Sequence, residues 1–166
     1  MITSKLKLDD LFRNTLKDIY FAEKKIVVTL PAMAKAATAP ELKKAFNDHK
    51  IQTEGHIKRL EEVFGLIKAP PQAKTCDAIM GILKEGKGLM TMYKGSSALD
   101  PALIAIAQAV EHYEMARYGT LKCWAGELGI MAAVSLLDAT LLEERATDKA
   151  LTTLAESTVN IHAEAA

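Results

Sequence analysis

Four long stretches of the chain carry apolar residues at helical spacing, and the way in which they are joined constrains the fold more than any other feature. They cover residues 8–37, 38–65, 100–129 and 130–160. Apolar residues three and four positions apart line one face of an α-helix. Strand signals are weak, because aromatic residues make up 5% of the chain and Asn-Gly and Asp-Gly pairs are absent. The sequence therefore predicts an all-α fold.

The links between these stretches differ in length. Short turns join the first stretch to the second and the third to the fourth, whereas residues 66–99 separate the two pairs. Within that crossover, residues 75–93 predict a short helix that Gly81, Gly86 and Gly88 weaken. A long middle connection makes two antiparallel hairpins that pack together, which is the ferritin-like four-helix arrangement. An up-and-down bundle would need only a short link there.

The chain is long enough for one domain with a core, because it has 166 residues of which 49% are hydrophobic. We therefore expect residues 1–166 to form a single ferritin-like domain. The helix ends carry recognisable signals. Pro40 fits a first helical turn, Gly65 fits a C-terminal stop, and Asp100 before Pro101 predicts an N-cap.

Charge and apolar length argue against two classes of partner. Lys plus Arg and Asp plus Glu number 21 each, so no basic excess indicates binding to nucleic acid. The most apolar segment, residues 102–110, is too short to span a bilayer, and the N-terminus lacks a signal-peptide pattern. Cys76 and Cys123 lie far apart in no metal-binding pattern. We expect a cytoplasmic protein that binds neither nucleic acid nor membrane.

Glu111 and Glu114 interrupt the apolar face of the third predicted helix. They lie three residues apart and so share one face, on a stripe that otherwise carries residues such as Ile104 and Leu121. A buried carboxylate is costly unless a cation or a hydrogen-bond donor compensates it. The other helices carry polar groups on similar stripes: Glu23 in the first, Gln52 and His56 in the second, and Glu144 and Asp148 in the fourth.

These polar groups are predicted to lie at one height in the bundle. Glu23 lies about sixteen residues before the first turn and His56 about seventeen after it, on helices that rise about 1.5 Å per residue. Glu114 and Glu144 each lie about fifteen residues from the turn near Gly129. Each side chain is therefore roughly 23–25 Å from its turn, so aligned hairpins would place all four in one layer.

Such a layer favours metal binding. Five carboxylates in a dry core would carry about five negative charges, and two divalent cations would bring about four positive charges. Carboxylate oxygen and imidazole nitrogen suit iron or manganese, whereas the lack of a cysteine cluster argues against a closed zinc site. The predicted metal ligands are Glu23, Gln52, His56, Glu111, Glu114, Glu144 and Asp148.

This ligand set departs from the usual pattern of a Glu from two helices and a Glu-x-x-His pair from the other two. No acid lies three residues before His56, and Asp148 follows Glu144 by four residues where a histidine is usual. Structural alternatives stay open as well, since Glu23 could pair with Lys24 and His56 could be a hydrogen-bonded core histidine.

Other polar residues near the layer have less specific interpretations. Tyr20 and Tyr118 flank it, either as hydrogen-bond donors to the ligands or as ordinary packing residues. A solvated face is expected for Glu54 and Glu143, and a structural role is expected for His49, His112 and His162.

Four motifs of the chain resemble the bacterial YciE/YciF family. They are Asp18-x-x-x-x-Glu23-Lys24, Gln52-Thr53-Glu54-Gly55-His56, Val110-Glu111-His112-Tyr113-Glu114 and Glu143-Glu144-Arg145-Ala146-Thr147-Asp148. The resemblance covers nearly the whole chain. It implies a ferritin-like bundle that forms a homodimer, is linked to the stress response and holds a dinuclear metal site. Many relatives have glutamate where this chain has Gln52, so the family pattern is broken at that position.

Two functional hypotheses follow. The first is a redox-active dinuclear iron or manganese protein that acts on dioxygen or peroxide at an open coordination position. The second is a non-enzymatic helical module that works through dimerisation and carries a degenerate metal site. The sequence does not decide whether the protein is an enzyme. Besides the resemblance, a dimer is suggested by spare apolar surface on the crossover helix, at Ile79, Met80, Ile82, Leu83, Leu89 and Met90.

Overall fold

The computed structural model describes residues 6–165, and over this range it contains helices and no strand. Its elements are α1 (Leu8–Ala36), α2 (Pro40–Leu66), α3 (Asp77–Met92), α4 (Leu99–Glu127), α5 (Met131–Leu154), the π-helical turn η1 (Ala155–Val159) and α6 (Asn160–Glu164). The all-α prediction is confirmed, with one difference. The fourth long stretch is not one regular helix to residue 160, because α5 passes through η1 before the short α6.

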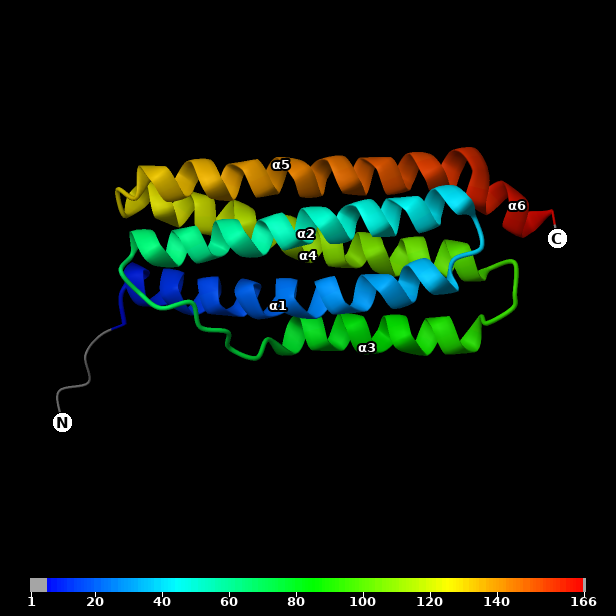
Figure 1. The fold of residues 1–166 in the computed structure, drawn as a ribbon, viewed down its shortest axis with the longest axis horizontal. Helices are drawn as coiled ribbons and strands as arrows, with labels where there is room; N and C mark the ends of the chain where they lie inside the picture. Colours follow the sequence, from blue (N-terminus) through cyan, green and yellow to red (C-terminus); the bar gives the residue numbers. More distant parts are fainter. Residues whose placement is uncertain (1–5, 166) are drawn as a thin grey trace.

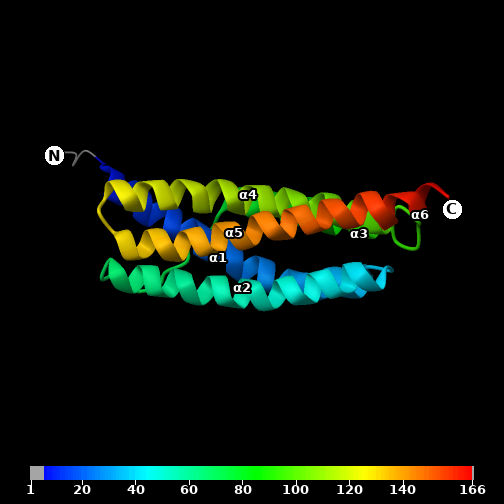
Figure 2. The same cartoon turned by 90° about the horizontal axis from the view of Figure 1, so that it is seen from above.

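The four long helices form two antiparallel hairpins that lie side by side. α1 and α2 make the first hairpin, and α4 and α5 make the second (Figure 1). α3, in the long crossover, packs against α4 and α1 on the outside of the bundle (Figures 1 and 2). This is the predicted ferritin-like bundle. No helix among residues 6–165 is long and apolar enough to cross a lipid bilayer.

Asp100 joins the two hairpins instead of capping its own helix. α4 already begins at Leu99, and the buried Asp100 carboxylate points at the turn between α1 and α2. It accepts hydrogen bonds from the backbone N–H groups of Thr38 (2.8 Å) and Ala39 (2.7 Å) and from the Thr38 hydroxyl (2.6 Å). These bonds satisfy donors that the start of α2 leaves free. Asp100 therefore holds the start of the second hairpin against the turn of the first.

The apolar side of α3 is largely used within the chain. Ile79 is fully buried, and Ile82, Leu83, Leu89 and Met90 pack against the core as partly buried residues. A Cβ atom at Gly86 would lie 2.8 Å from Cγ1 of Ile106, so the close approach of α3 to α4 requires glycine there. Among the six apolar residues noted on this helix, Met80 is the one classed as exposed, at 43%. A homodimer stays a prediction that rests on the resemblance.

Candidate metal centre

Six acidic and histidine side chains from all four long helices meet in the middle of the bundle. Each is buried, with at most 4% of its surface exposed. They form two groups whose potential ligand atoms lie within 4.8 Å of one another: His49, Glu111, Glu114 and Glu144 in the first, and Glu23, His56 and Glu144 in the second. Glu144 belongs to both groups, so the two candidate metal positions are adjacent and share one carboxylate.

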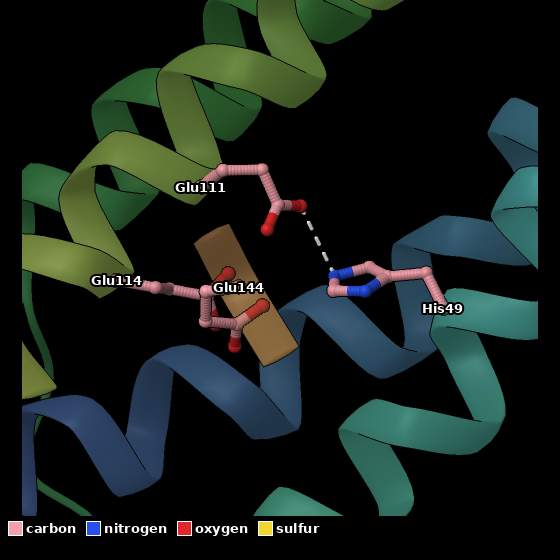
Figure 3. Close-up of side chains that lie close together, drawn as sticks. All are labelled: His49, Glu111, Glu114 and Glu144. Atoms are coloured by element: carbon pink, nitrogen blue, oxygen red, sulfur yellow. Dashed lines mark ion pairs between the residues drawn. The ribbon is translucent and has the colours of Figure 1, made fainter. Parts of the chain in front are cut away.

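The first group, which we call the His49 side, has few internal partners. Figure 3 shows Glu111 and Glu114 from α4, His49 from α2 and Glu144 from α5 pointing toward one another. Nε2 of His49 lies 3.2 Å from Oε1 of Glu111. Both oxygens of Glu114, Oε2 of Glu111 and both ring nitrogens of His49 lack a partner in hydrogen-bond geometry. Buried polar atoms are normally paired, and a group of donors that converges in this way can hold a metal ion.

The second group, the His56 side, is organised around the histidine ring. Nδ1 of His56 lies 3.0 Å from Oε1 of Glu144 and 3.5 Å from Oε1 of Glu23. On the other edge of the ring, Nε2 pairs with Oε2 of Glu143 at 2.9 Å. The Tyr118 hydroxyl donates a hydrogen bond to Glu23. The ring therefore turns one nitrogen to the carboxylates of the centre while the other is held from outside.

Arg59 completes this outer support. Its guanidinium donates hydrogen bonds to both oxygens of Glu143, at 2.6 and 2.8 Å, and to the Thr140 hydroxyl at 3.2 Å. The hydrogen bond from Arg59 lowers the pKa of Glu143 and so keeps it ionised. A carboxylate that holds the far nitrogen of a histidine fixes the ring for metal binding. Glu143 is partly exposed, as its position on the helix predicts, but its carboxylate also pairs with His56 and Arg59, which the sequence does not show.

The electrostatics of the centre also separate its two sides. Burial, followed by the negative charge of Glu144, raises the pKa values of Glu111 and Glu114 well above their ordinary value. Burial opposes the charging of His56, but its hydrogen bonds to Glu144 and Glu23 outweigh that and raise its pKa to about 10. On the His56 side, the raised pKa of the histidine favours an imidazolium that offsets the nearby carboxylates, whereas burial favours the protonated form of Glu111 and Glu114.

The structure places the seven predicted ligands in two sets. Glu23, His56, Glu111, Glu114 and Glu144 come together in the groups described above. Gln52 is exposed and accepts a 3.4 Å hydrogen bond from Thr147, and Asp148 is partly buried and accepts one from Gln108 at 3.0 Å. Asp148 belongs to neither of these groups. The ligand roles of Gln52 and Asp148 stay predictions.

Two features of the centre were not expected from the sequence. His49 was interpreted as structural, yet it supplies the imidazole of the first group. Its signal is the seven-residue spacing to His56, which is two helical turns and places both rings on one face of α2. Of the two candidate hydroxyl donors, Tyr118 does contact a carboxylate of the centre, whereas Tyr20 donates to Glu61 at 2.8 Å instead.

Comparison with known proteins identifies relatives that match nearly the whole chain. A family model described as "Domain of unknown function (DUF892)" matches residues 7–164. Protein YciF of Escherichia coli strain K12 is 39% identical over an alignment of 161 residues, and the match covers 95% of each of the two chains.

Solved structures agree with these sequence matches. The crystal structure of the E. coli stress protein YciF has a TM-score of 0.88 and covers 93% of this chain and 98% of its own. YcfI of Rhodopseudomonas palustris, whose description suggests a structural role, is 39% identical, with a TM-score of 0.88 and coverage of 92% and 98%. A Xanthomonas campestris protein that is 22% identical shares the fold, with a TM-score of 0.76.

Proposed function

The chain belongs to the DUF892 family of YciF-like proteins, and from this premise we propose that it binds two iron or manganese ions in its core. One observation carries the proposal. Buried oxygen and nitrogen atoms of His49, Glu111 and Glu114 converge without hydrogen-bond partners among the described residues, next to Glu23, His56 and Glu144. Such atoms are costly in a protein interior unless a cation coordinates them.

The residues of the centre fit two divalent cations in charge and in donor type. The carboxylates of Glu23, Glu111, Glu114 and Glu144 can bring four negative charges, which offset two divalent ions. Glu144 is placed to serve both ions because it belongs to both groups, and each group has one histidine. Oxygen and imidazole donors suit iron and manganese. Asp148 lies outside these groups, and Gln52 contacts Thr147.

The chain's own residues orient the ligands. Tyr118 holds Glu23, and the pair of Glu143 and Arg59 holds His56. Iron or manganese, when bound, would supply redox chemistry toward dioxygen or peroxide. Tyr118 is fully buried, so the proton that it donates to Glu23 has no direct exchange with solvent.

Metal analysis tests this proposal directly. We expect the purified chain to take up two equivalents of iron(II) under anaerobic conditions, measured by elemental analysis after removal of free metal. Glu114→Gln should lower this stoichiometry, whereas Glu54→Gln should not, because Glu54 is exposed and pairs with Lys50 on the surface. A chain that contains neither metal as purified and takes up none would overturn the proposal.

A non-enzymatic helical module is the second candidate. It is favoured by the description of the R. palustris relative and by the network of His56, Glu143 and Arg59, which offsets part of the buried charge without metal. Metal-loaded protein that consumes neither dioxygen nor peroxide would favour the non-enzymatic module.

We also propose that the chain forms a homodimer in the cytoplasm and has a role in the stress response. The stress role is proposed because the E. coli relative is described as a stress protein. Light scattering tests the dimer.

A further inference from the structure

A cavity of about 290 Å³ lies beside the metal centre and reaches the surface between α2 and α5. Figure 2 shows the ribbons of these two helices diverging toward the end of the bundle that carries the α1–α2 turn. The outer lining comes from exposed residues of both helices, including Asp48 and Gln52 of α2 and Ala146 and Ala150 of α5. The inner end is formed by His49 and Glu111, which are candidate metal ligands.

The walls between the mouth and the inner end are almost entirely apolar. They are formed by buried side chains from α1, α2, α4 and α5, with Leu83 of α3, and examples are Ile26, Leu30, Phe46, Val110 and Leu151. Ligand sites in proteins typically combine an apolar cavity with a few convergent polar groups. Unpaired atoms of His49 and Glu111 supply those groups here.

We propose that this cavity binds a small uncharged organic molecule that has an apolar body and one polar end. The polar end would lie at His49 and Glu111, and the body would lie along the apolar walls. This inference goes beyond the proposed function, because it depends on the cavity and not on bound metal.

Size and charge select this class of ligand. An engineered apolar cavity of about 150 Å³ holds benzene, so a cavity of about twice that volume can hold a chain of about eight carbons. No lysine or arginine lines the described cavity, so an anionic head group would find no cationic partner. The Asp48 carboxylate lies at the mouth, and its negative charge disfavours an anion further.

Gln52, which the sequence predicts to be a metal ligand, lies at the rim of the cavity. Its side-chain oxygen accepts the hydrogen bond from Thr147, which joins α2 to α5 at the rim of the cavity. The neighbouring rim residues Ala146 and Ala150 are small, and they leave the entrance unobstructed. The rim therefore offers surface positions at which the cavity can be closed without disturbing the core.

Binding of 1-octanol to the metal-free chain tests the proposal, with octanoate as the matched anion. We expect saturable binding of one octanol per chain in calorimetry, with NMR shifts at Val110 and Leu151, and octanoate weaker by at least about tenfold. Ala107→Leu, inside the cavity, and Ala150→Leu, at the rim, should each weaken octanol binding by a similar factor. Ala105→Leu is the control, because Ala105 is exposed on α4 and does not line the cavity.

The possible results separate this proposal from the metal proposal. Octanol that does not saturate, octanoate that binds as tightly, or Ala150→Leu binding that equals that of the Ala105→Leu control would overturn the cavity proposal. Octanol binding by a chain that takes up no iron would support the cavity and contradict only the metal centre. Because Ala150 is on the surface, its variant keeps the test valid even if Ala107→Leu fails to fold.

Discussion

The two sides of the polar layer are supported in different ways. On the His56 side, the histidine contacts Glu23, Glu143 and Glu144, and Arg59 anchors Glu143. On the His49 side, Glu111 and Glu114 keep unpaired buried oxygens, and the apolar cavity begins beside Glu111. The side chains of the His56 side are thus held in place by hydrogen bonds and ion pairs. The His49 side keeps unpaired atoms next to a cavity that can admit a ligand. If the centre binds two metal ions as proposed, one position is held rigidly and the other lies next to the cavity.

Replacing each histidine in the metal-free chain should give the largest difference in stability between the two sides. His56→Ala should lower the free energy of unfolding by about 3–5 kcal/mol, because it leaves buried carboxylates without their cationic partner. His49→Ala should cost less than about 1.5 kcal/mol, since His49 makes no hydrogen bond through its ring nitrogens. Urea denaturation measures both values. Equal losses would mean that the two sides are not supported differently.

The pH dependence of stability provides the next largest effect. Because the pKa values of Glu111 and Glu114 are raised in the folded chain, their stabilising contribution is complete below the ordinary pKa of 4.5 and is lost as the pH rises. His56 adds a loss of the same sign between pH 6.5 and about 10. The metal-free chain should therefore lose up to about 1.4 kcal/mol per pH unit for each of these groups as it titrates.

Thermal unfolding of the metal-free chain between about pH 5 and about pH 8 measures this slope. Metal-loaded protein should show a flatter profile, because bound cations keep the carboxylates ionised. A metal-free chain whose stability rises over this range would show that Glu111 and Glu114 are ionised in the fold.

Neutralising one carboxylate on each side should have opposite effects on the metal-free chain. Glu114→Gln should stabilise it by about 1–3 kcal/mol near pH 8, because a buried acid with a raised pKa is replaced by an uncharged group. Glu143→Gln should destabilise it by about 1 kcal/mol, because Arg59 and His56 lose an ionised partner. Chemical denaturation compares the two variants, and a shift of the same sign in both would remove the distinction between the sides.

Arg59→Lys is expected to have the smallest effect on stability. A lysine cannot reproduce the two parallel hydrogen bonds to Glu143, so the variant should lose about 1 kcal/mol or less. Metal affinity is the more informative measurement, and it should fall by about tenfold at the site on the His56 side. Stepwise metal titration resolves the sites, and an equal loss at both would show that Arg59 does not act through His56.

Much of this architecture could be predicted because it depends on local periodicity. The helix positions, the crossover and the mid-bundle height of Glu23, His56, Glu111, Glu114 and Glu144 all follow from spacing along the chain. The contacts of His49 and Glu143 could not be predicted, because the spacing of residues on one helix does not show which side chains of the neighbouring helices face them. Gln52 illustrates the same limit: it lies three residues after His49, yet its rotation around α2 takes it to the rim of the cavity.

The sequence by itself determined that four helices carry acids and histidines at one depth, since residue spacing sets both the face and the height of a side chain on a helix. Only the tertiary structure decided which of them meet, which nitrogen of His56 faces the carboxylates, and where the helices leave an open cavity. Those properties depend on the rotation and separation of packed helices, which no single helix encodes. Glu111 and Glu114 are therefore visible as an anomaly in the sequence, but the cavity beside Glu111 becomes visible only in the packed bundle.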